Sequence, residues 1–548
     1  MKTLRIYLKG LMFGFTIVFA AVSFAQTHIP AGNVSGNWTT SGSPYLIEGE
    51  ISISAGQTLT IEPGVLVEFQ DHYKLNVQGN IQAVGTQNDS ICFTIDDTTG
   101  FSNLLVPDGG WHGIRFGNST PGNDTSRISF CRLEWGKAVG SSPDNSGGAI
   151  AVESYNNLVI SNSLITHSIA AFSGGGIAIS NSDIIVRDNT FYQNGAGFAC
   201  GGIAISSCDP LIVNNKIDNN IALSSGGGLG LNNSANPDII DNVIINNTAK
   251  YGGGIQMKTN CNPLITNNIL YFNTADLEGG GADMEDNCNP LFVNNTIVHN
   301  LAPIGGGIDC EVNSSPVFRN TILWWNVGYA DGSQVHLFSE DSDPDFYYCD
   351  IEGGSEAFGL WYGGTVYFNY SGVYENNIDV NPDTTSQNGY LFLLADTSPC
   401  IDAGDPDDIY NDVENLANPG FAKWPSKGLL RNDMGVYGGP GCLYFEPVTG
   451  IEEKFNFDLS GQQYQVFQNY PNPFTETTTI SWQLPKETHV ILKVYDFTGR
   501  EIKTLVDCRM TKGDHKINFN ASGLPAGVYF YQLKASGRIE IKRMIVIK

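Results

Sequence analysis

The chain has 548 residues and a formal net charge of −27, with 56 acidic and 29 basic side chains. This length is too great for one ordinary globular core, and the negative charge makes nucleic acid an unsuitable partner because its phosphates are repelled. The 11 cysteines are few for this length, and the eight histidines are scattered. This pattern disfavours a disulfide-dense scaffold and a zinc site.

Residues 1–25 have the form of a secretory signal peptide. Lys2, Arg5 and Lys9 provide a basic start, an apolar run follows, and small residues end it before Gln26. The apolar run is too short to span a bilayer comfortably as a helix. We therefore expect removal of residues 1–25 on export, and the sequence predicts no transmembrane helix in the mature chain.

Residues 26–145 predict short, irregular strands. The segment "PYLIEGEISISAGQTLTIEPGVLVEF" alternates apolar and polar residues, which is typical of strands with one buried face. "GWHGIRFGN" continues the alternation without a constant period. We interpret this region as an N-terminal cap and early coils of the repeat that follows.

Residues 146–400 contain a repeat with two independent markers. A glycine cluster such as "SGGGIAISN" recurs seven times, and an asparagine recurs in step with it. Both markers keep a spacing close to 26 residues, which chance does not explain. The positions are Ala149, Gly176, Gly202, Gly228, Gly254, Gly281 and Gly307 for the first marker, and Asn162, Asn189, Asn215, Asn242, Asn268, Asn295 and Asn320 for the second.

Each repeat holds two or three short alternating runs separated by polar turns, and no run has a helical stripe. Strands this short satisfy their backbone groups only by pairing with the same strand one repeat later. The sequence therefore predicts an all-β chain, a parallel β-solenoid with about three strands per turn. Glycine permits its sharp corners, and stacked asparagines bond to their copies in adjacent coils.

The segment "GGGIAIS…IIVRDNTFYQN" resembles the right-handed parallel β-helix of pectate-lyase-like proteins. The resemblance covers about residues 40–400 and implies a three-sheet coil with an asparagine ladder at the second turn. It does not identify an activity, because the same coil serves lyases, hydrolases, adhesins and passive surface proteins.

Strand alternation predicts two outward-facing rows on the first sheet. Adjacent coils lie about 4.8 Å apart, so members of a row are direct neighbours. The early coils present small residues, whereas Asp283 is expected opposite Asp309, and Glu285 opposite Glu311. The rows are Ala151, Ala178, Ala204, Gly230, Gln256, Asp283 and Asp309, and then Glu153, Ser180, Ser206, Asn232, Lys258, Glu285 and Glu311.

Like charges placed opposite each other destabilise a sheet, so a chain usually accepts them for a cation or for catalysis. Asp283, Glu285, Asp309 and Glu311 form a candidate Ca²⁺ site. By resemblance to β-helix lyases, Lys258 is a candidate base beside Asp283 and Asp309; hydrolysis by the Asp pair is a further alternative. Gln256, Glu285, Glu311, Trp324 and Trp325 are the candidate substrate-binding residues. An ordinary solvated acidic face remains open.

Residues 401–446 are expected to cap the second end of the solenoid. Asp402, Asp405 and Asp407 form an alternative Ca²⁺ site, or else a capping turn rich in Asx bends. Cys261 and Cys288 lie one coil apart, so either a disulfide or a stack of free thiols fits the spacing.

Residues 447–465 read as a linker, and 466–548 as a small β-sandwich with regularly spaced turns. The words "YPNPF", "VYDFTGREI" and "LPAGVYFYQL" resemble the C-terminal sorting domain of the type IX secretion system. The resemblance implies contact with that secretion machinery and export across the outer membrane.

We therefore expect a secreted or surface-attached, monomeric β-helix protein that recognises an extracellular glycan or polysaccharide. A polysaccharide lyase or glycoside hydrolase acting from the outer face of the first sheet is the main alternative, the lyase ahead of the hydrolase. An adhesin or passive surface structure is the third. The sequence names no substrate and leaves enzyme activity open.

Overall fold

A computed structural model describes residues 26–117, 124–362, 365–366, 369–387, 390–442 and most of 465–546. The signal-peptide prediction and residues 447–464 of the predicted linker lie outside the described residues. The chain divides into two compact units, Met1–Ile451 and Glu452–Lys548, each described here by itself. In the described residues, no helix is long and apolar enough to cross a membrane.

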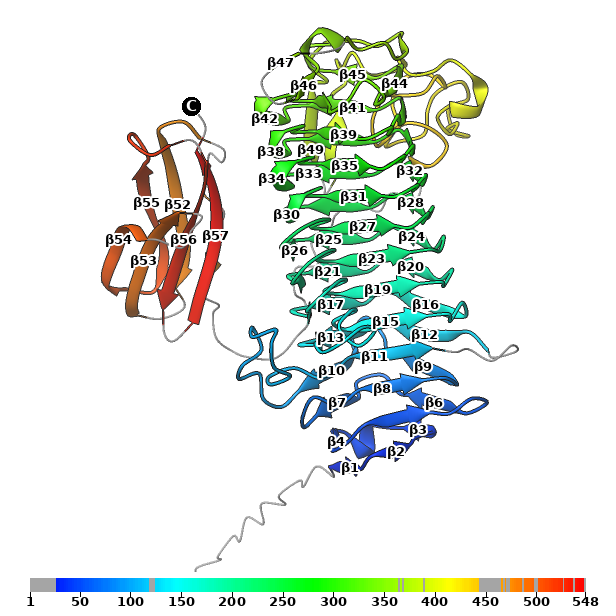
Figure 1. Ribbon diagram of the computed structural model, residues 1–548, viewed down its shortest axis with the longest axis vertical. Helices are drawn as coiled ribbons and strands as arrows, with labels where there is room; N and C mark the ends of the chain where they lie inside the picture. The colour runs from blue at the N-terminus through cyan, green and yellow to red at the C-terminus, as the bar shows by residue number, and fades with distance from the viewer. Residues whose placement is uncertain are drawn as a thin grey trace, which may run out of the picture. The chain divides into compact units, whose positions relative to one another are not determined.

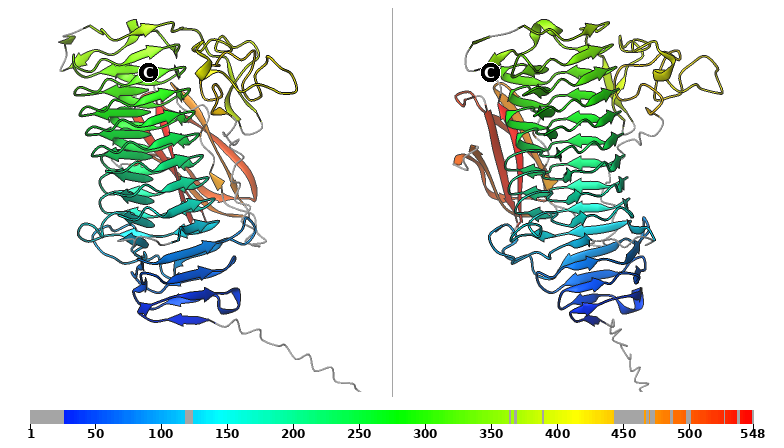
Figure 2. Two further views of the ribbon diagram at one scale, coloured as in Figure 1. Left: turned by 90° about the vertical axis from the view of Figure 1, so that its right-hand side faces the viewer. Right: turned by 45° about the vertical axis from the view of Figure 1, so that its right-hand side comes forward.

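The first unit is a parallel β-solenoid, which confirms the predicted fold (Figure 1). Each regular coil adds one strand to each of four sheets, which we number by their order within a coil. Among the described residues, sheets 1, 2 and 3 contain 12, 13 and 13 strands, and sheet 4 contains 8. The prediction of three strands per turn therefore missed the short fourth strand. Figure 2 shows the coils stacked along one axis.

Sheet 1 carries the candidate residues. Its strands are β2 (Gly32–Asn33), β5 (Ile51–Ile53), β8 (Leu75–Val77), β11 (Ile114–Gly117), β15 (Ile150–Glu153), β19 (Ile177–Ser180), β23 (Ile203–Ser206), β27 (Leu229–Asn232), β31 (Ile255–Lys258), β35 (Ala282–Glu285), β39 (Ile308–Cys310) and β43 (Val335–Leu337).

Sheet 4 immediately precedes sheet 1 in each coil. Its strands are β14 (Lys137–Ala138), β18 (Ile169–Ala170), β22 (Gly195–Ala196), β26 (Ile221–Ala222), β30 (Thr248–Tyr251), β34 (Thr274–Glu278), β38 (Leu301–Ile304) and β42 (Val327–Asp331). Sheet 2 runs from β3 (Gly36–Trp38) to β48 (Tyr374–Glu375), and sheet 3 from β1 (Thr27–Ile29) to β45 (Asp350–Ile351).

One continuous core fills the solenoid. The inward side chains of sheet 1, such as Ile177 and Ile179, are fully or almost fully buried. In sheet 2, Phe318 stacks between Phe292 and Phe346, with ring centroids 4.5 and 4.9 Å apart. Because the strands pair in register, equivalent side chains of successive coils stack on each other, and every coil buries apolar surface against the next.

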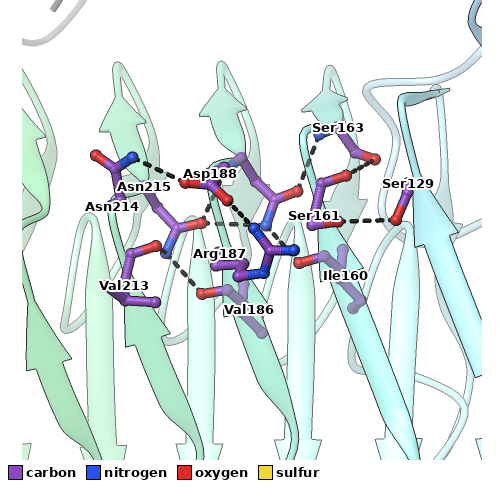
Figure 3. A network of polar contacts seen from close by, with 11 residues as sticks. Ser129, Ile160, Ser161, Ser163, Val186, Arg187, Asp188, Val213, Asn214 and Asn215 are labelled. Atoms are coloured by element: carbon purple, nitrogen blue, oxygen red, sulfur yellow. Dashed lines mark hydrogen bonds and ion pairs between the residues drawn. The ribbon is translucent and has the colours of Figure 1, made fainter. Parts of the chain in front are cut away.

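Asparagine ladders line two of the corners. The first, between sheets 2 and 3, begins at Ser163, runs through Asn189 and Asn215, and ends at Thr321. Figure 3 shows its first part, from Ser163 to Asn215. The predicted ladder is confirmed from Asn189 to Asn295 and wrong at its ends. Asn162 and Asn320 occupy the preceding position, where a left-handed backbone (φ 50° and 52°) turns the corner.

A second buried ladder stands between sheets 3 and 4, where the sequence had not predicted one. Each backbone N–H donates to the amide oxygen one coil on, at about 3.0 Å, so neighbouring coils are tied together inside the corner. Its members are Asn194, Asn220, Asn247, Asn273, Asn300 and Asn326.

The last strand of the stacked sheets, β48, ends at Glu375, and an isolated parallel bridge joins Asp350 to Ile378, so the described parallel pairing stops before residue 400. An antiparallel hairpin, β49 (Thr384–Gln387) and β50 (Tyr390–Leu394), follows. Residues 390–442 then pack on sheet 3 of the late coils, where Met434 and Leu394 bury Trp324 and Ile322. This segment covers the side of the solenoid in the coils from Val243 to Ile322.

The second unit has two antiparallel sheets around its own core, as the predicted β-sandwich requires. Trp482, Tyr531 and Phe519 are among its buried residues. The sheets are β51 (Gln465–Val466), β52 (Thr477–Leu484) and β55 (Gly513–Asn520), and then β54 (Glu501–Met510), β53 (Thr488–Asp496), β56 (Gly527–Ala535) and β57 (Arg538–Val546).

Candidate functional site

The outer face of sheet 1 brings the predicted row together in register. Gln256 pairs with Asp283, Asp283 with Asp309, and Asp309 with His336 on the following strand. Residues about one repeat apart in the chain are thus direct neighbours, as the predicted stacking requires. The row does not end at Asp309, because His336 on β43 continues it.

This row is not an open surface, which corrects the expectation of an exposed acidic face. Asp283 is 1% exposed and Asp309 0%. The glycine turn that leaves sheet 4 crosses directly over each of them. At Gly279 and Gly305 the backbone is left-handed (φ 66° and 60°), and an added Cβ would lie 2.5 and 2.9 Å from the Cβ of the Asp beneath. Only glycine lets the turn pass this close.

Beneath these turns lies a cluster of carboxyl groups, which we call the acidic centre: Glu278, Asp283, Asp309 and Glu311. Single ligand atoms of Glu278, Asp309 and Glu311 all lie within 4.8 Å of one another. Glu278 is the last residue of β34, and Glu311 directly follows β39. A spacing of this kind matches several oxygen ligands arranged around one cation.

Two carboxylate oxygens in the centre, Asp283 Oδ1 and Asp309 Oδ2, are fully buried and have no hydrogen-bond partner among the described residues. The other oxygen of Asp309 accepts a hydrogen bond from His336 Nδ1. Asp331, on β42, approaches the opposite ring nitrogen of His336 at 4.0 Å. Orphaned carboxylate oxygens are costly to bury, so a proton or a cation has to offset them.

The pKa values in the acidic centre also indicate that its carboxyl groups need protons or a cation. Burial, followed by repulsion from neighbouring carboxylates, raises the pKa of Glu311 to about 11. The same two causes raise the pKa of Asp283 well above its ordinary value and raise that of Glu278. Without a cation, Glu311 therefore retains its proton at neutral pH, and burial favours the protonated forms of Asp283 and Glu278.

Lys258 is engaged elsewhere. Its ammonium forms an ion pair with Glu285 at 2.7 Å, and the hydrogen bond that it donates to this carboxylate raises the pKa of Lys258. A lysine with a raised pKa stays protonated at neutral pH, which argues against the predicted role as a base. The side chain of Glu285 contacts Lys258, whereas that of Glu311 lies with Glu278 and Asp309, so the two glutamates have different partners.

Of the two tryptophans predicted to bind substrate, one is buried and the other is half-buried. Trp324 is 6% exposed under Met434 and Leu394 and has no face free for a sugar, which corrects that expectation. Trp325 is half-buried and stacks on His299, with ring centroids 5.0 Å apart. Neither residue lies on sheet 1, because β41 (Ile322–Trp324) belongs to sheet 3.

The second predicted calcium site is used for folding the cap. Asp405 forms an ion pair with Arg319, and Asp407 caps a short 3₁₀ turn by accepting from the backbone N–H of Ile409. Asp402 accepts from the N–H of Leu429. These contacts match the alternative of an Asx-rich capping turn.

Sequence reasoning missed Glu278 and His336. Glu278 lies directly before a glycine triplet, a turn position to which strand alternation assigns no face. His336 follows Asp309 by one repeat, but there the triplet has become "DGSQ", so the marker used for alignment is lost. The constant repeat length alone would have placed it in the row.

Comparisons with known proteins support the architecture. A family model described as the right handed beta helix region matches residues 80–252 and 201–378, and one described as a secretion system C-terminal sorting domain matches residues 468–548. The chain is also similar to Protein bark beetle of Drosophila melanogaster, with 41% identity over 75 residues. That match covers 14% of this chain and only 2% of the relative's length. No solved structure matches.

Proposed function

Because the chain belongs to the right-handed β-helix family and carries a sorting domain for export, we propose that it is a monomeric extracellular glycan-binding protein with a divalent cation in its acidic centre. The sorting domain marks it for secretion across the outer membrane to the cell surface or the extracellular space, and for contact with the type IX machinery. The β-helix is then the part that meets the surroundings.

The geometry of the acidic centre is the observation that supports cation binding. Glu278, Asp309 and Glu311 offer converging oxygens, and Asp309 keeps one buried oxygen without a partner. Hard oxygen ligands of this kind suit Ca²⁺. Bound there, the ion would take the place of protons on Glu278 and Glu311, whose pKa values are raised, and it would offer its open coordination positions to hydroxyl or carboxylate groups of a sugar.

A row of polar side chains beside the acidic centre supports the proposal of glycan binding. Asn232, Lys258 and Glu285 are successive cross-strand neighbours on sheet 1, and each is partly exposed. Ser180 and Ser206 continue the row over earlier coils. Donors and acceptors repeated about every 4.8 Å suit a polyhydroxylated chain lying along the solenoid axis.

The test combines calcium and glycans. Calcium titration calorimetry on the full chain is expected to show one site, which is lost in the double variant Asp309→Asn, Glu311→Gln. Asp341→Asn, which changes an exposed acid away from the centre, is the matched control. A double variant that still binds calcium equally well would remove the proposed centre.

The glycan half is tested with immobilised neutral and uronate-containing polysaccharides, with and without calcium. Wild type is expected to bind at least one of them, and Asn232→Ala to bind that glycan more weakly while its calcium affinity is unchanged. No binding to any polysaccharide, with calcium binding intact, would reject glycan recognition and leave a passive surface role.

The same samples test the catalytic alternatives. A rise in the ultraviolet absorbance of unsaturated uronates would establish a lyase, and release of reducing sugar without that rise a hydrolase. We expect neither, because the Lys258 ammonium is paired with Glu285 and both aspartates are closed off under the glycine turns.

A further inference from the structure

Cys261 and Cys288 occupy equivalent positions in adjacent coils. Lys258 and Glu285 are direct partners where β31 pairs with β35, and each cysteine follows three residues after its member of that pair. The backbone N–H of Cys261 lies 3.3 Å from the sulfur of Cys288. In the described structure both are free thiols and fully buried.

The equivalent positions in successive coils form a column, and only Cys261 and Cys288 place two cysteines in adjacent coils of it. The next contact is of the same kind, but Ser314 replaces cysteine and its hydroxyl accepts from the N–H of Cys288 at 3.1 Å. On the other side Ala235 separates Cys261 from Cys208. Cys208 is thus two coils from Cys261, about 9.6 Å, which is beyond the reach of a disulfide.

We propose that Cys261 and Cys288 are a modification site at which a disulfide forms between adjacent coils when the exported chain folds under oxidising conditions. Coils about 4.8 Å apart fall within the Cα separation that a disulfide bridges. Export removes the chain from the reducing cytosol. Because the folded thiols are buried, the bond forms before the two coils close on each other.

The chemistry is thiol–disulfide exchange with a disulfide donor, a small-molecule or protein disulfide. The Cys261 thiolate attacks a donor sulfur and gives a mixed disulfide and one donor thiol. The Cys288 thiolate then attacks the Cys261 sulfur and releases the second donor thiol. Two protein thiols thus lose two electrons and two protons, and the donor disulfide gains them.

The bond would join the coil that bears Gln256 and Lys258 to the coil that bears Asp283 and Glu285. The sulfur of Cys261 already lies 3.3 Å from the carbonyl oxygen of Lys258, and that of Cys288 lies 3.0 Å from that of Glu285. A staple here closes a loop of one full coil and holds the edge of the acidic centre. The inference does not depend on glycan or cation binding.

The test is refolding of the full chain in oxidised glutathione, followed by alkylation of free thiols, non-reducing digestion and mass spectrometry. We expect a cross-linked peptide pair containing Cys261 and Cys288, and alkylated Cys208. Alkylation of both Cys261 and Cys288, or either one bonded to a different cysteine, would overturn the proposal.

A second measurement tests whether the disulfide slows unfolding. The oxidised protein is expected to unfold in denaturant at least tenfold more slowly than the same protein kept in reductant. Cys288→Ser is the control, since Ser314 shows that serine fits this column, and reductant should then change its rate little. Equal rates for oxidised and reduced wild type would count against a constraint at this position.

Discussion

At the residue scale, burial distinguishes the carboxyl groups of the acidic centre from the many other acidic residues of the chain. The chain has many exposed acids that need no explanation, but Asp283 and Asp309 are almost wholly withdrawn from water and lie among other carboxyl groups. The pKa of Asp283 rises because its charged form loses solvation and is repelled by its neighbours. In the proposed cation site, a bound ion would take the place of the protons on such carboxyl groups.

This pKa shift predicts a pH dependence. Unfolded Glu311 ionises near 4.5, whereas in the folded chain the pKa of about 11 keeps it protonated, so between these values the folded state binds more protons. In chelator, the free energy of unfolding is therefore expected to fall as pH rises from 5 to 8. Glu311→Gln mimics the protonated form and should remove up to about 1.4 kcal/mol of that fall per pH unit.

Denaturant titrations at several pH values measure this slope. Other buried acids with raised pKa values, such as Asp412, contribute to the wild-type slope, so the difference between wild type and variant is the informative quantity. Asp341→Asn should leave the slope unchanged. A Glu311→Gln slope equal to wild type would mean that Glu311 is ionised in the folded chain.

Calcium should compete with protons for the acidic centre and, like them, stabilise the folded chain. Since the ion takes the place of protons, it is expected to raise the melting temperature at pH 8 much more than at pH 5. At a concentration 100 times its dissociation constant, the ion adds about 2.7 kcal/mol of stability. Calorimetric melting with calcium and with chelator measures this, and equal shifts at both pH values would contradict exchange with protons.

At the element scale, the turns and ladders decide how the strands are placed. The turn between sheets 4 and 1 covers the outer row, and the two buried asparagine ladders hold the corners on either side of sheet 3. A single strand contributes little by itself, because each is only two to five residues long in the solenoid. Stability therefore comes from contacts repeated between coils.

The glycine turn over Asp309 gives a sharp test. Gly305→Ala is expected to destabilise the coil by about 2 kcal/mol or more and to weaken calcium binding, because its Cβ would press on Ile308 O at 2.6 Å and on Asp309. Gly56→Ala has a similar left-handed backbone but nothing within 4 Å, and should cost about 1 kcal/mol with calcium affinity intact. Equal effects of the two variants would refute the close approach.

The ladders allow a matched comparison between buried and exposed amides. Asn242 is fully buried, and its side chain donates to Ile212 O and Asn268 Oδ1. Asn262 makes the same kind of coil-to-coil contact, accepting from Asn289 N–H at 2.8 Å, but it is exposed. Asn242→Ala is expected to cost about 2–4 kcal/mol and Asn262→Ala less than about 1 kcal/mol, because only the buried backbone groups are left unpaired. Similar losses in denaturant titrations would contradict this reason.

At the scale of the whole molecule, the two units have separate cores. The hydrophobic clusters of the solenoid and of the sorting domain share no residue. The sorting domain is thus a unit for delivery, whereas the solenoid carries the acidic centre and the polar row. Each core satisfies its own burial, so either unit can lose its fold without removing contacts inside the other.

Deletion of residues 468–548 tests this separation. The truncated chain is expected to remain cell-associated, while its solenoid melts at the wild-type temperature and binds calcium equally well. Fractionation of cells and calorimetry measure the two outcomes. Normal export of the truncated chain would contradict the role of the sorting domain, and a lowered melting temperature would contradict the independence of the solenoid.

The sequence by itself determined the period, the parallel stacking, the order of residues in the outer row and the presence of the sorting domain. The physical reason is that short alternating strands have one way to satisfy their backbone groups, which is to pair with their copies one repeat later. That rule places Asp283 beside Asp309 without any coordinates, and extended by one repeat it would also have placed His336.

Only the tertiary structure decided what covers the row and what reaches into it. Glu278 enters from a turn, Lys258 turns to Glu285, and Trp324 is buried by a segment more than sixty residues later in the chain. Alternation assigns a side of a sheet, but exposure depends on where turns and remote segments pass. That path is set by packing among residues far apart in sequence. For this reason the sequence showed only a row of charges, whereas the structure shows two buried aspartates with the partly exposed Glu278 and Glu311 beside them.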